Sequence, residues 1–313
     1  MCGLFGFSNY SNDKIKNLSD LTNSLAEQSA VRGTDATGIA FTSSGGINII
    51  KDSKSAYKMN FKHSDDIVAL IGHTRHSTQG SEKKNYNNHP FSGKCNNTQF
   101  ALAHNGVLSN DKELRHKFKL SKTKIETDSY IAVQVVESQK HLGLGFDSLR
   151  YTAELCEGSF AYSLIDDINN IWLVKGDSPL SILHFPKLKM YVYASTDEIL
   201  YKALVDYQPL FKALKSGDFE QIEISEGEIL KIRPDGTTER NTFEYSYYYG
   251  RGWWDYGFSS ISLGNGKITD TRNEYLESLK SIASCQGYSP EDIDELITAG
   301  FSLDEIEDYI YEF

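Results

Sequence analysis

The hydrophobic positions in the first part of the chain predict an amphipathic helix followed by short strands. Between residues 14 and 30, apolar side chains recur every three or four positions, which places them on one face of a helix. They are Ile15, Leu18, Leu21, Leu25 and Ala26. After Gly33, short apolar runs bounded by turn residues predict strands. These runs are 38–42, 47–51, 67–73 and 100–103.

The middle of the chain predicts two further helices and then a meander of strands. Helical spacing covers 128–139 and 146–156. Strand-like runs separated by turn sequences follow at 159–165, 171–175, 181–185 and 190–194. A helix at 196–206, strands near 219–224 and 228–232, and a turn at 233–236 complete this part. Many strands with a few helices indicate an α+β layered domain over residues 2–240.

The residues after 240 differ in composition and predict a separate C-terminal part. Residues 241–268 are rich in aromatic side chains and glycine without a clear period, so we interpret them as a linker. Residues 269–313 predict an acidic module of three short helices. One of these helices begins with Ser289 as its N-cap and Pro290 in its first turn.

Charge is concentrated in this C-terminal part. The whole chain has a net charge of −11, and residues 270–313 contain twelve acidic residues against Arg272 and Lys280. The main body is therefore near neutral and has no basic stripe that would suit nucleic acid. Two interpretations of the acidic module stay open, namely a solvated helical surface and a docking surface for a basic partner protein.

The composition predicts a cytoplasmic protein with reduced thiols. No apolar stretch approaches the length that spans a bilayer, and the N-terminus lacks the pattern of a signal peptide. The four cysteines form no CxxC pair and no zinc-spaced cluster with histidine. They are Cys2, Cys95, Cys156 and Cys285. We therefore expect no metal site and no association with membranes.

Cys2 is the strongest candidate for chemistry because it directly follows the initiator methionine. A small second residue permits removal of Met1, which would make Cys2 the mature N-terminus. Its α-amine would titrate near roughly 7.7–8.0, as suits a general base, beside a thiol that is an intrinsically good nucleophile. The alternative is that Cys2 is an ordinary small apolar residue at the start of a strand.

Four further motifs follow the N-terminal MCGLFG in a fixed order. They are RGTDATG at 32–38, GHTRHSTQG at 72–80, HNG at 104–106 and ETDS at 126–129. His-Asn-Gly alone is a common turn sequence. Together, the motifs resemble the glutaminase domain of class II glutamine amidotransferases, which are N-terminal-nucleophile hydrolases. The resemblance covers about residues 2–240 and is greatest to the glutaminase domain of glucosamine-6-phosphate synthase.

This resemblance implies a fold and a reaction. The fold is a four-layer αββα sandwich with two antiparallel sheets, to which the small C-terminal helical segment is added. In the reaction, Cys2 attacks the side-chain amide of L-glutamine, ammonia leaves from a γ-glutamyl thioester, and water then releases glutamate. No cofactor or metal is needed for this amide cleavage.

The resemblance also assigns the catalytic residues. The Asn105 side chain and the Gly106 backbone N–H would donate to the oxyanion of the tetrahedral intermediate. Arg32 would lie near the nucleophile and order the N-terminus. The alternative for the Asn105-Gly106 pair is a plain tight turn.

Glutamine is a zwitterion, so its recognition requires a cation and an anion. Arg75 suits the carboxylate because a guanidinium binds it bidentately, and Thr78 would add a hydroxyl donor. Asp128 suits the ammonium group, and Gly106 completes the substrate site. An ion pair between Arg75 and Asp128 with a purely structural role is the alternative.

Three residues beside these positions depart from the family pattern. His76 stands where the relatives usually carry an aromatic residue, most often Trp. Gln79 stands where they often carry His, and Tyr130 where an acidic or small residue is usual. We interpret His76 as a packed or solvated side chain rather than a catalytic acid or base.

The acceptor of the ammonia is not identified by the motifs. About 70 residues follow residue 240, which is too short for the synthase domains of full-length amidotransferases. We therefore expect an ammonia-supplying subunit that works with a separate synthase or amidoligase protein. A free-standing glutaminase or γ-glutamyl amide hydrolase, and a non-catalytic adaptor, are the alternatives.

Overall fold

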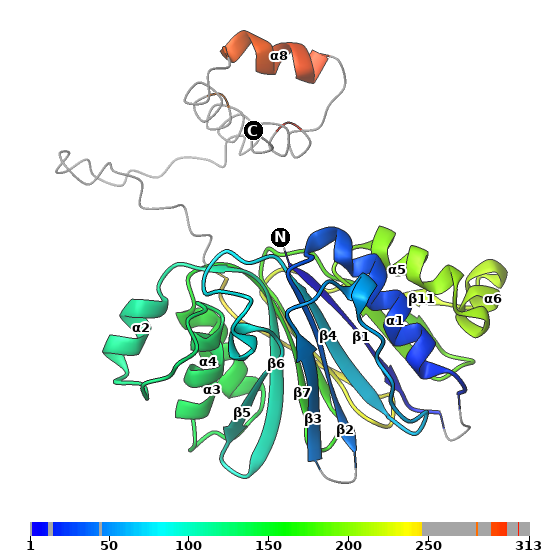
Figure 1. Cartoon of the computed structure of the whole chain (residues 1–313), viewed down its shortest axis with the longest axis horizontal. Coiled ribbons are helices and arrows are strands. Elements are labelled where there is room, and N and C mark those ends of the chain that lie inside the picture. Colours follow the sequence, from blue (N-terminus) through cyan, green and yellow to red (C-terminus); the bar gives the residue numbers. More distant parts are fainter. Residues whose placement is uncertain are drawn as a thin grey trace, which may run out of the picture. The chain divides into compact units, whose positions relative to one another are not determined.

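The computed structural model describes residues 2–11, 15–43, 46–245, 280, 289–298 and 306, and its chain divides into two units (Figure 1). The first unit, Met1–Arg251, holds every described strand. The second unit, Gly252–Phe313, holds the described helix α8 (Pro290–Thr298). All the residues to which the motifs assign a role therefore belong to the first unit.

The first sheet has seven strands, with β1 (Gly3–Asn9) inside it rather than at an edge. The strand order is β11-β9-β10-β1-β4-β2-β3, and every described pair is antiparallel. β1 pairs with β10 (Met190–Ala194) on one side and with β4 (Ala69–Arg75) on the other. The other strands are β2 (Ala36–Ser43), β3 (Gly46–Asp52), β9 (Ser181–Phe185) and β11 (Glu220–Gln221).

The second sheet has six strands in the order β13-β12-β8-β7-β6-β5, again antiparallel in every described pair. Its longest strand is β6 (Thr98–Leu108), which pairs with β7 (Gly158–Asp166) along nine residues. The other strands are β5 (Phe91–Cys95), β8 (Ile171–Lys175), β12 (Glu228–Ile232) and β13 (Thr238–Thr242).

Helices cover the outer face of each sheet, which makes four layers (Figure 1). The first sheet is covered by α1 (Leu18–Ser29), α5 (Asp197–Val205) and α6 (Gln208–Ser216). The second is covered by α2 (Asp111–Lys117), α3 (Tyr130–Ser138) and α4 (Phe146–Leu155). This is the αββα arrangement that the resemblance predicted.

The core is divided among the three interfaces between these layers. All seven residues of β1 are buried, because both faces of its sheet are covered. Phe5 and Phe7 pack outwards against α1, α5 and α6, whereas Leu4 packs inwards between the sheets. Full burial of one such side chain contributes roughly 1.5–3 kcal/mol. The alternation along the strand also decides which later residues face the space between the sheets.

The helices expected at 14–30, 128–139, 146–156 and 196–206 are present as α1, α3, α4 and α5. α1 begins later than expected, at Leu18, because its N-terminal amides are satisfied from a distant loop. The Asp65 carboxylate accepts hydrogen bonds from the backbone N–H groups of Asn17 and Leu18 at 3.0 and 2.9 Å. The sequence analysis did not identify α2 and α6, which are short.

The strand expected at 100–103 is longer than the sequence pattern indicated. It continues as β6 through His104, Asn105 and Gly106, which pair with residues 162, 161 and 160 of β7. The HNG motif is therefore not a turn that ends the strand, because Gly106 keeps the ladder with φ 134°. The strands expected at 38–42, 47–51 and 67–73 are present as β2, β3 and β4 with shifted ends.

The second unit agrees with the expected helix start at Ser289. Ser289 and Asp292 cap each other reciprocally: the Asp292 N–H donates to Ser289 Oγ at 3.2 Å and the Ser289 N–H donates to Asp292 Oδ2 at 2.7 Å. The linker after residue 245 and the flanking expected helices lie outside the described residues, except for Lys280 and Ile306. The division into 2–240, 241–268 and 269–313 stays a prediction, although Phe243 and Tyr245 still pack on the core beside α4.

Among the described residues, no helix combines the length and the apolar character that crossing a membrane requires.

The cap on α1 gives a stability prediction. Replacing Asp65 with alanine leaves two N-terminal amides of α1 without their acceptor, and we expect a loss of about 1 kcal/mol. Thermal unfolding of the full chain should show a Tm lower by about 2–4 °C. Asp65→Asn keeps one acceptor oxygen and should lose less. An unchanged Tm for Asp65→Ala would contradict this cap.

Candidate active site

Cys2 lies directly before β1, where several bonds fix the start of the strand. The Arg32 guanidinium donates through Nε to the Cys2 carbonyl at 2.7 Å. Two residues on, the Leu4 N–H donates to Ser195 Oγ at 2.8 Å, and the Ser195 N–H donates to the Leu4 carbonyl at 2.9 Å. The Cys2 thiol remains partly exposed and lies 3.5 Å from the His76 carbonyl.

The strand alternation directs four of the relevant side chains into the space between the sheets. Cys2 lies on the same face of β1 as Leu4, which packs in the inner core. On β4, His73 and Arg75 share the face of Ile71, which also packs there. On β6, Asn105 shares the face of Ala101 and Ala103, again in the inner core. The two sheets thus present these groups towards each other.

A hydrogen bond between the sheets brings these groups to the same edge. Leu4 pairs with His73 across β1 and β4, and the His73 ring donates through Nε2 to the His104 carbonyl at 2.9 Å. On the first sheet, Cys2 lies two residues before Leu4. On the second sheet, Asn105 directly follows His104. The nucleophile candidate and the oxyanion candidate therefore lie at the same edge of the sandwich, where β1 begins.

The electrostatics of the Cys2 thiol connect it to the two predicted substrate-binding residues. Burial raises the thiol pKa above its ordinary value, and a hydrogen bond with the His76 backbone opposes this rise. The positive charge of Arg75 lowers the same pKa and the negative charge of Asp128 raises it. Both charged groups therefore act on the sulfur. A thiol with a raised pKa requires a base to become a nucleophile at neutral pH.

Asn105 carries a buried hydrogen-bond donor that is not used. Its side chain is 2% exposed, and Nδ2 has no partner among the described residues. A buried unpaired donor costs roughly 1–3 kcal/mol, so such a group in a folded protein calls for an explanation. A donor kept free for a developing negative charge is one explanation.

Gly106, the next residue, is restricted to glycine by its surroundings. A Cβ atom on it would lie 2.0 Å from the Ser159 carbonyl oxygen on β7, and its φ of 134° disfavours any other residue. Gly3 and Gly33 are constrained in a similar way. A Cβ on Gly3 would lie 2.6 Å from Thr74 Oγ1, and one on Gly33 would lie 2.4 Å from the Arg75 carbonyl carbon.

Arg75 ends β4 and is only 3% exposed. Its Nη1 donates to Asn88 Oδ1 at 2.8 Å, and its Nη2 donates to the carbonyls of Gln79 and Gly80, each at 2.7 Å. A guanidinium has five N–H donors, so these three bonds leave two for a ligand. No ion pair joins Arg75 to Asp128 among the described residues, and the structural alternative for these two side chains is therefore not observed.

Asp128 is also buried, at 3% exposure, and lies beside the end of β6. Its Oδ2 accepts the Leu108 N–H at 2.7 Å, whereas Oδ1 has only a long contact of 3.5 Å with Ser129 Oγ. The same Ser129 hydroxyl lies 2.8 Å from His104 Nδ1. One carboxylate oxygen is thus fixed to the strand that carries Asn105, and the other keeps acceptor capacity.

Three buried histidines lie beneath this edge, namely His73, His89 and His104. The rings of His73 and His89 are 4.1 Å apart between centroids, and neither ring nitrogen of His89 has a partner among the described residues. Burial lowers the pKa of all three, to about 3 for His73. These rings are neutral at physiological pH.

Sequence reasoning missed two asparagines that hold the loops of the site together. Asn87 donates through Nδ2 to the Ser81 carbonyl at 3.0 Å and accepts the Glu126 N–H at 2.9 Å. Asn88 accepts from Arg75 and donates to the Glu82 carbonyl at 2.8 Å. Both side chains are fully buried. The polar run 85–89 was the available signal, because such a run is buried only when its groups are paired.

The remaining predicted residues lie on or near the loop after β4. His76 and Thr78 are exposed, and Gln79 contributes its carbonyl to Arg75. Tyr130 packs edge-to-face on Phe91, with ring centroids 5.5 Å apart. Within the described part of the chain, no three His, Cys, Asp or Glu side chains form a cluster that would hold a metal ion.

Comparison with known proteins identifies the class to which this site belongs. Residues 1–134 match the family model for class II glutamine amidotransferases. The N-terminal part of the chain is thus similar to the class II glutamine amidotransferases, as the motif order predicted, and the homologous members of this class are enzymes with an N-terminal cysteine nucleophile.

Two curated relatives show which kind of glutaminase domain it resembles. Glutamine–fructose-6-phosphate aminotransferase (isomerizing) of Halalkalibacterium halodurans is 31% identical over 188 residues, and that of Staphylococcus epidermidis is 33% identical over 190. Each match covers 58% of this chain but only 30% of the relative. The matched region therefore spans less than a third of the length of these relatives.

Two solved structures share the fold. Glutamine phosphoribosylpyrophosphate amidotransferase from B. subtilis has a TM-score of 0.56 at 21% identity, covering 79% of this chain and 50% of that one. An allosteric regulatory enzyme of purine biosynthesis has a TM-score of 0.57 at 19% identity with the same coverage. These similarities confirm the predicted four-layer αββα fold.

The buried histidines generate a prediction about acid stability. In the unfolded chain their pKa is about 6.5, whereas burial keeps the folded rings neutral far below that pH. Their contribution is complete above about pH 6.5 and is lost as the pH falls towards the folded pKa. His89→Leu should therefore reduce the loss of unfolding free energy between pH 7 and pH 5 by about 2 kcal/mol, measured by urea denaturation. The same loss in His89→Leu and wild type, or a similar reduction in the exposed control His116→Leu, would contradict it.

The hydrogen bonds of Asn87 generate a second prediction. Asn87→Ala leaves the Ser81 carbonyl and the Glu126 N–H unpaired, and we expect a loss of about 1–3 kcal/mol in unfolding free energy. The Asn87 side chain joins the loop held by Arg75 to the segment that leads to Asp128. Without it, KM for glutamine should rise more than kcat falls. Asn97→Ala, at an exposed position of the β5–β6 turn, is the control. An unfolding free energy of Asn87→Ala equal to that of the wild type would contradict the stabilising role of the Asn87 hydrogen bonds.

Proposed function

We propose that this domain hydrolyses the side-chain amide of L-glutamine, with Cys2 as the nucleophile after Met1 has been removed. The single observation that carries the proposal is the free, buried Asn105 donor, which lies at the edge where Cys2 begins β1. A nucleophile facing an unused donor is the arrangement that acyl transfer requires.

The reaction is proposed to proceed in two halves. The Cys2 thiol gives its proton to the Cys2 α-amine, which becomes an ammonium group, and the resulting thiolate attacks the amide carbon of glutamine. The oxyanion that forms accepts hydrogen bonds from Asn105 Nδ2 and the Gly106 N–H. The amine then protonates the leaving nitrogen, the carbon–nitrogen bond breaks, and ammonia departs from the γ-glutamyl thioester. Water attacks the thioester, which releases glutamate and restores the thiol.

The substrate would be held by its amino-acid end. The two remaining N–H donors of Arg75 suit the glutamine carboxylate, and Thr78 on the exposed part of the loop offers a hydroxyl. The less occupied Asp128 Oδ1 suits the ammonium group. Arg32 would position the N-terminus through the Cys2 carbonyl. Two of these groups support the assignment most, because the charges of Arg75 and Asp128 already act on the Cys2 sulfur.

The ammonia is proposed to serve an acceptor reaction outside this domain, on a separate synthase or amidoligase protein. The curated relatives support an acceptor outside this domain, because the region that matches this chain makes up only 30% of their length. A free-standing glutaminase is the second candidate. The observation in its favour is that the first unit alone brings together all the proposed residues. The free Asn105 donor, the Arg75 cation and the Asp128 anion count against a non-catalytic adaptor.

Kinetics of purified variants test the hydrolysis. Asn105→Ala should lower kcat for glutamine hydrolysis by about 10²–10³-fold with little change in KM, because the donor acts on the transition state. Cys2→Ala should have no activity above background. Asn97→Ala, exposed in the β5–β6 turn, should retain the wild-type rate.

An Asn105→Ala variant that keeps the wild-type kcat, with the chain folded, would contradict the proposed oxyanion site. The same assay separates the two candidates for the ammonia. A purified chain that already turns over glutamine at 1 per second or faster, within the usual enzyme range of roughly 1–10³ s⁻¹, favours the free-standing glutaminase. A rate that rises only with an added acceptor protein favours the subunit.

A further inference from the structure

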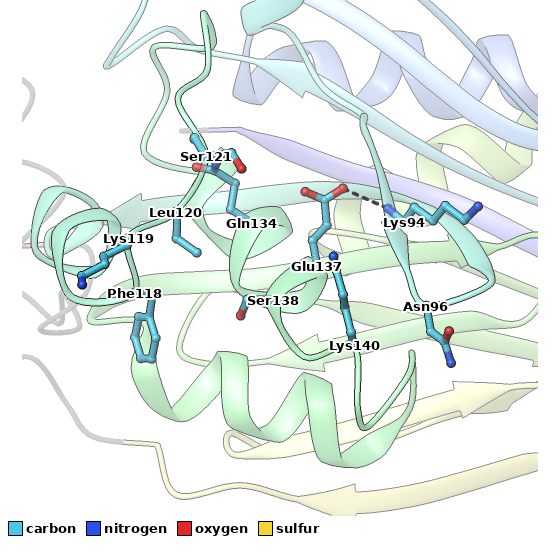
Figure 2. A pocket seen from close by; sticks show the side chains of 10 residues that line it. All are labelled: Lys94, Asn96, Phe118, Lys119, Leu120, Ser121, Gln134, Glu137, Ser138 and Lys140. Atoms are coloured by element: carbon cyan, nitrogen blue, oxygen red, sulfur yellow. Dashed lines mark hydrogen bonds between the residues drawn. The ribbon is translucent and has the colours of Figure 1, made fainter.

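A cleft of about 760 Å³ opens at a place that the proposed reaction does not use (Figure 2). Its walls are the turn after β5, the turn after α2 and the C-terminal end of α3. Asp128 and Ser129 immediately precede α3, so the cleft lies towards the opposite end of that helix from the substrate site. The volume is within the range of about 300–1,000 Å³ that is usual for small-molecule sites.

The lining of the cleft contains three lysines from three different elements. They are Lys94 on β5, Lys119 after α2 and Lys140 after α3. None of their ammonium groups forms an ion pair or a hydrogen bond with another described residue. The one carboxylate in the lining is that of Glu137, so the lining carries more positive than negative charge.

Glu137 is tied into the wall of the cleft. Its Oε1 accepts the backbone N–H of Lys94 at 3.0 Å, the bond drawn in Figure 2. Burial raises the pKa of this carboxyl, and the nearby charge of Lys140 opposes the rise. Lys140 stands beside Glu137, and Lys119 lies on the turn at the other side of the cleft, where its side chain is directed away from Glu137 and Lys140 (Figure 2). Lys94 and Glu137 also line a second hollow of about 370 Å³, so Lys94 stands between the two.

Lys119 adopts a backbone conformation that glycine usually adopts after the end of a helix. Its φ of 48° is left-handed, and it follows the C-cap of α2. The Leu120 N–H donates to the Arg115 carbonyl at 3.1 Å, which closes the turn. Glycine is the usual residue at such a position because it carries no Cβ. A lysine in a conformation that costs free energy is explained if its ammonium group is needed there.

Acceptors and apolar groups complete the lining. Gln134 is 5% exposed and donates through Nε2 to the Ser121 carbonyl at 2.7 Å, whereas its Oε1 has no partner among the described residues. Gln134 Oε1 and the second oxygen of Glu137 are acceptors that suit hydroxyl groups. Phe118 and Leu120 add apolar surface. The lining therefore combines cations, hydroxyl acceptors and a small apolar wall.

We propose that this cleft binds a small phosphate-bearing molecule that also carries hydroxyl groups, with Lys119 and Lys140 as its main phosphate contacts. Ammonium groups are common phosphate ligands, and the lining sets three lysines against the single carboxylate of Glu137. The limited volume selects a small molecule over an extended polyanion.

Calorimetric titration of the full chain tests this site. The probes are inorganic phosphate, glycerol 3-phosphate and adenosine 5′-monophosphate, at about 0.1 M salt, where the screening length is about 10 Å. We expect saturable binding of at least one hydroxylated probe, tighter than that of inorganic phosphate. Tighter binding of glycerol 3-phosphate would indicate a short polyol phosphate, and tighter binding of adenosine 5′-monophosphate a nucleotide.

Two variants and one control locate the binding. Lys119→Gly and Lys140→Gln should each raise the Kd of the tighter-binding probe by about tenfold, which is the effect of losing one charged contact. Lys119→Gly should keep or raise the Tm, because glycine suits the left-handed turn. Lys122→Gln removes a nearby exposed lysine that does not line the cleft and should leave the Kd unchanged.

Three results would overturn the proposal. They are the absence of saturable binding for all three probes, unchanged binding in Lys119→Gly and Lys140→Gln, and an equal weakening in Lys122→Gln, which would show a general attraction to basic residues. Binding of inorganic phosphate as tight as that of both hydroxylated probes would overturn the assigned role of Gln134 and Glu137. Since none of these residues touches the proposed glutamine site, the outcome is independent of the glutaminase assay.

Discussion

The hydrogen bond from the His73 ring to the His104 carbonyl joins the two sheets at the edge where the candidate chemistry lies. On the first sheet, His73 pairs with Leu4, two residues from Cys2. On the second sheet, His104 directly precedes Asn105. The separation between the proposed nucleophile and the oxyanion donors therefore depends on how closely the sheets approach here. Both partners are buried, and burial lowers the pKa of His73 to about 3, so the donor stays a neutral imidazole at physiological pH.

Packing around this bond allows the close approach. The inner core contains several alanines, among them Ala101, Ala103 and Ala161, and such small side chains let two sheets lie near each other. Glycines then admit backbone contacts that no Cβ would permit, at Gly33 against Arg75 and at Gly106 against Ser159. Buried polar groups complete the arrangement, because Arg75 and Asp128 spend part of their hydrogen-bonding capacity on the protein and keep the rest. Arg75 and Asp128 are thus fixed by the protein and still have hydrogen-bonding groups available for a ligand.

The sequence predicted much of this arrangement, and its failures have physical causes. Apolar spacing found α1, α3, α4 and α5, because their buried faces follow the helical period. The order of the motifs predicted the fold. The sequence did not predict that β6 runs through His104–Gly106, since a turn-forming pair within a strand depends on pairing with β7. It also missed the cap from Asp65 and the bonds of Asn87 and Asn88, because these contacts join residues far apart in the chain. Alternation along β1, β4 and β6 could have shown which side chains face inwards.

The central claim is that a processed N-terminal cysteine attacks a carboxamide within reach of a cation and an anion that grip an amino acid. Intact mass measurement after incubation with 6-diazo-5-oxo-norleucine, followed by peptide mapping, tests it most directly. The account predicts a chain without Met1 that carries one adduct on Cys2, and protection of Cys2 by excess glutamine. An unmodified chain, an adduct on Cys95, Cys156 or Cys285, or a reactive chain that retains Met1 would contradict it.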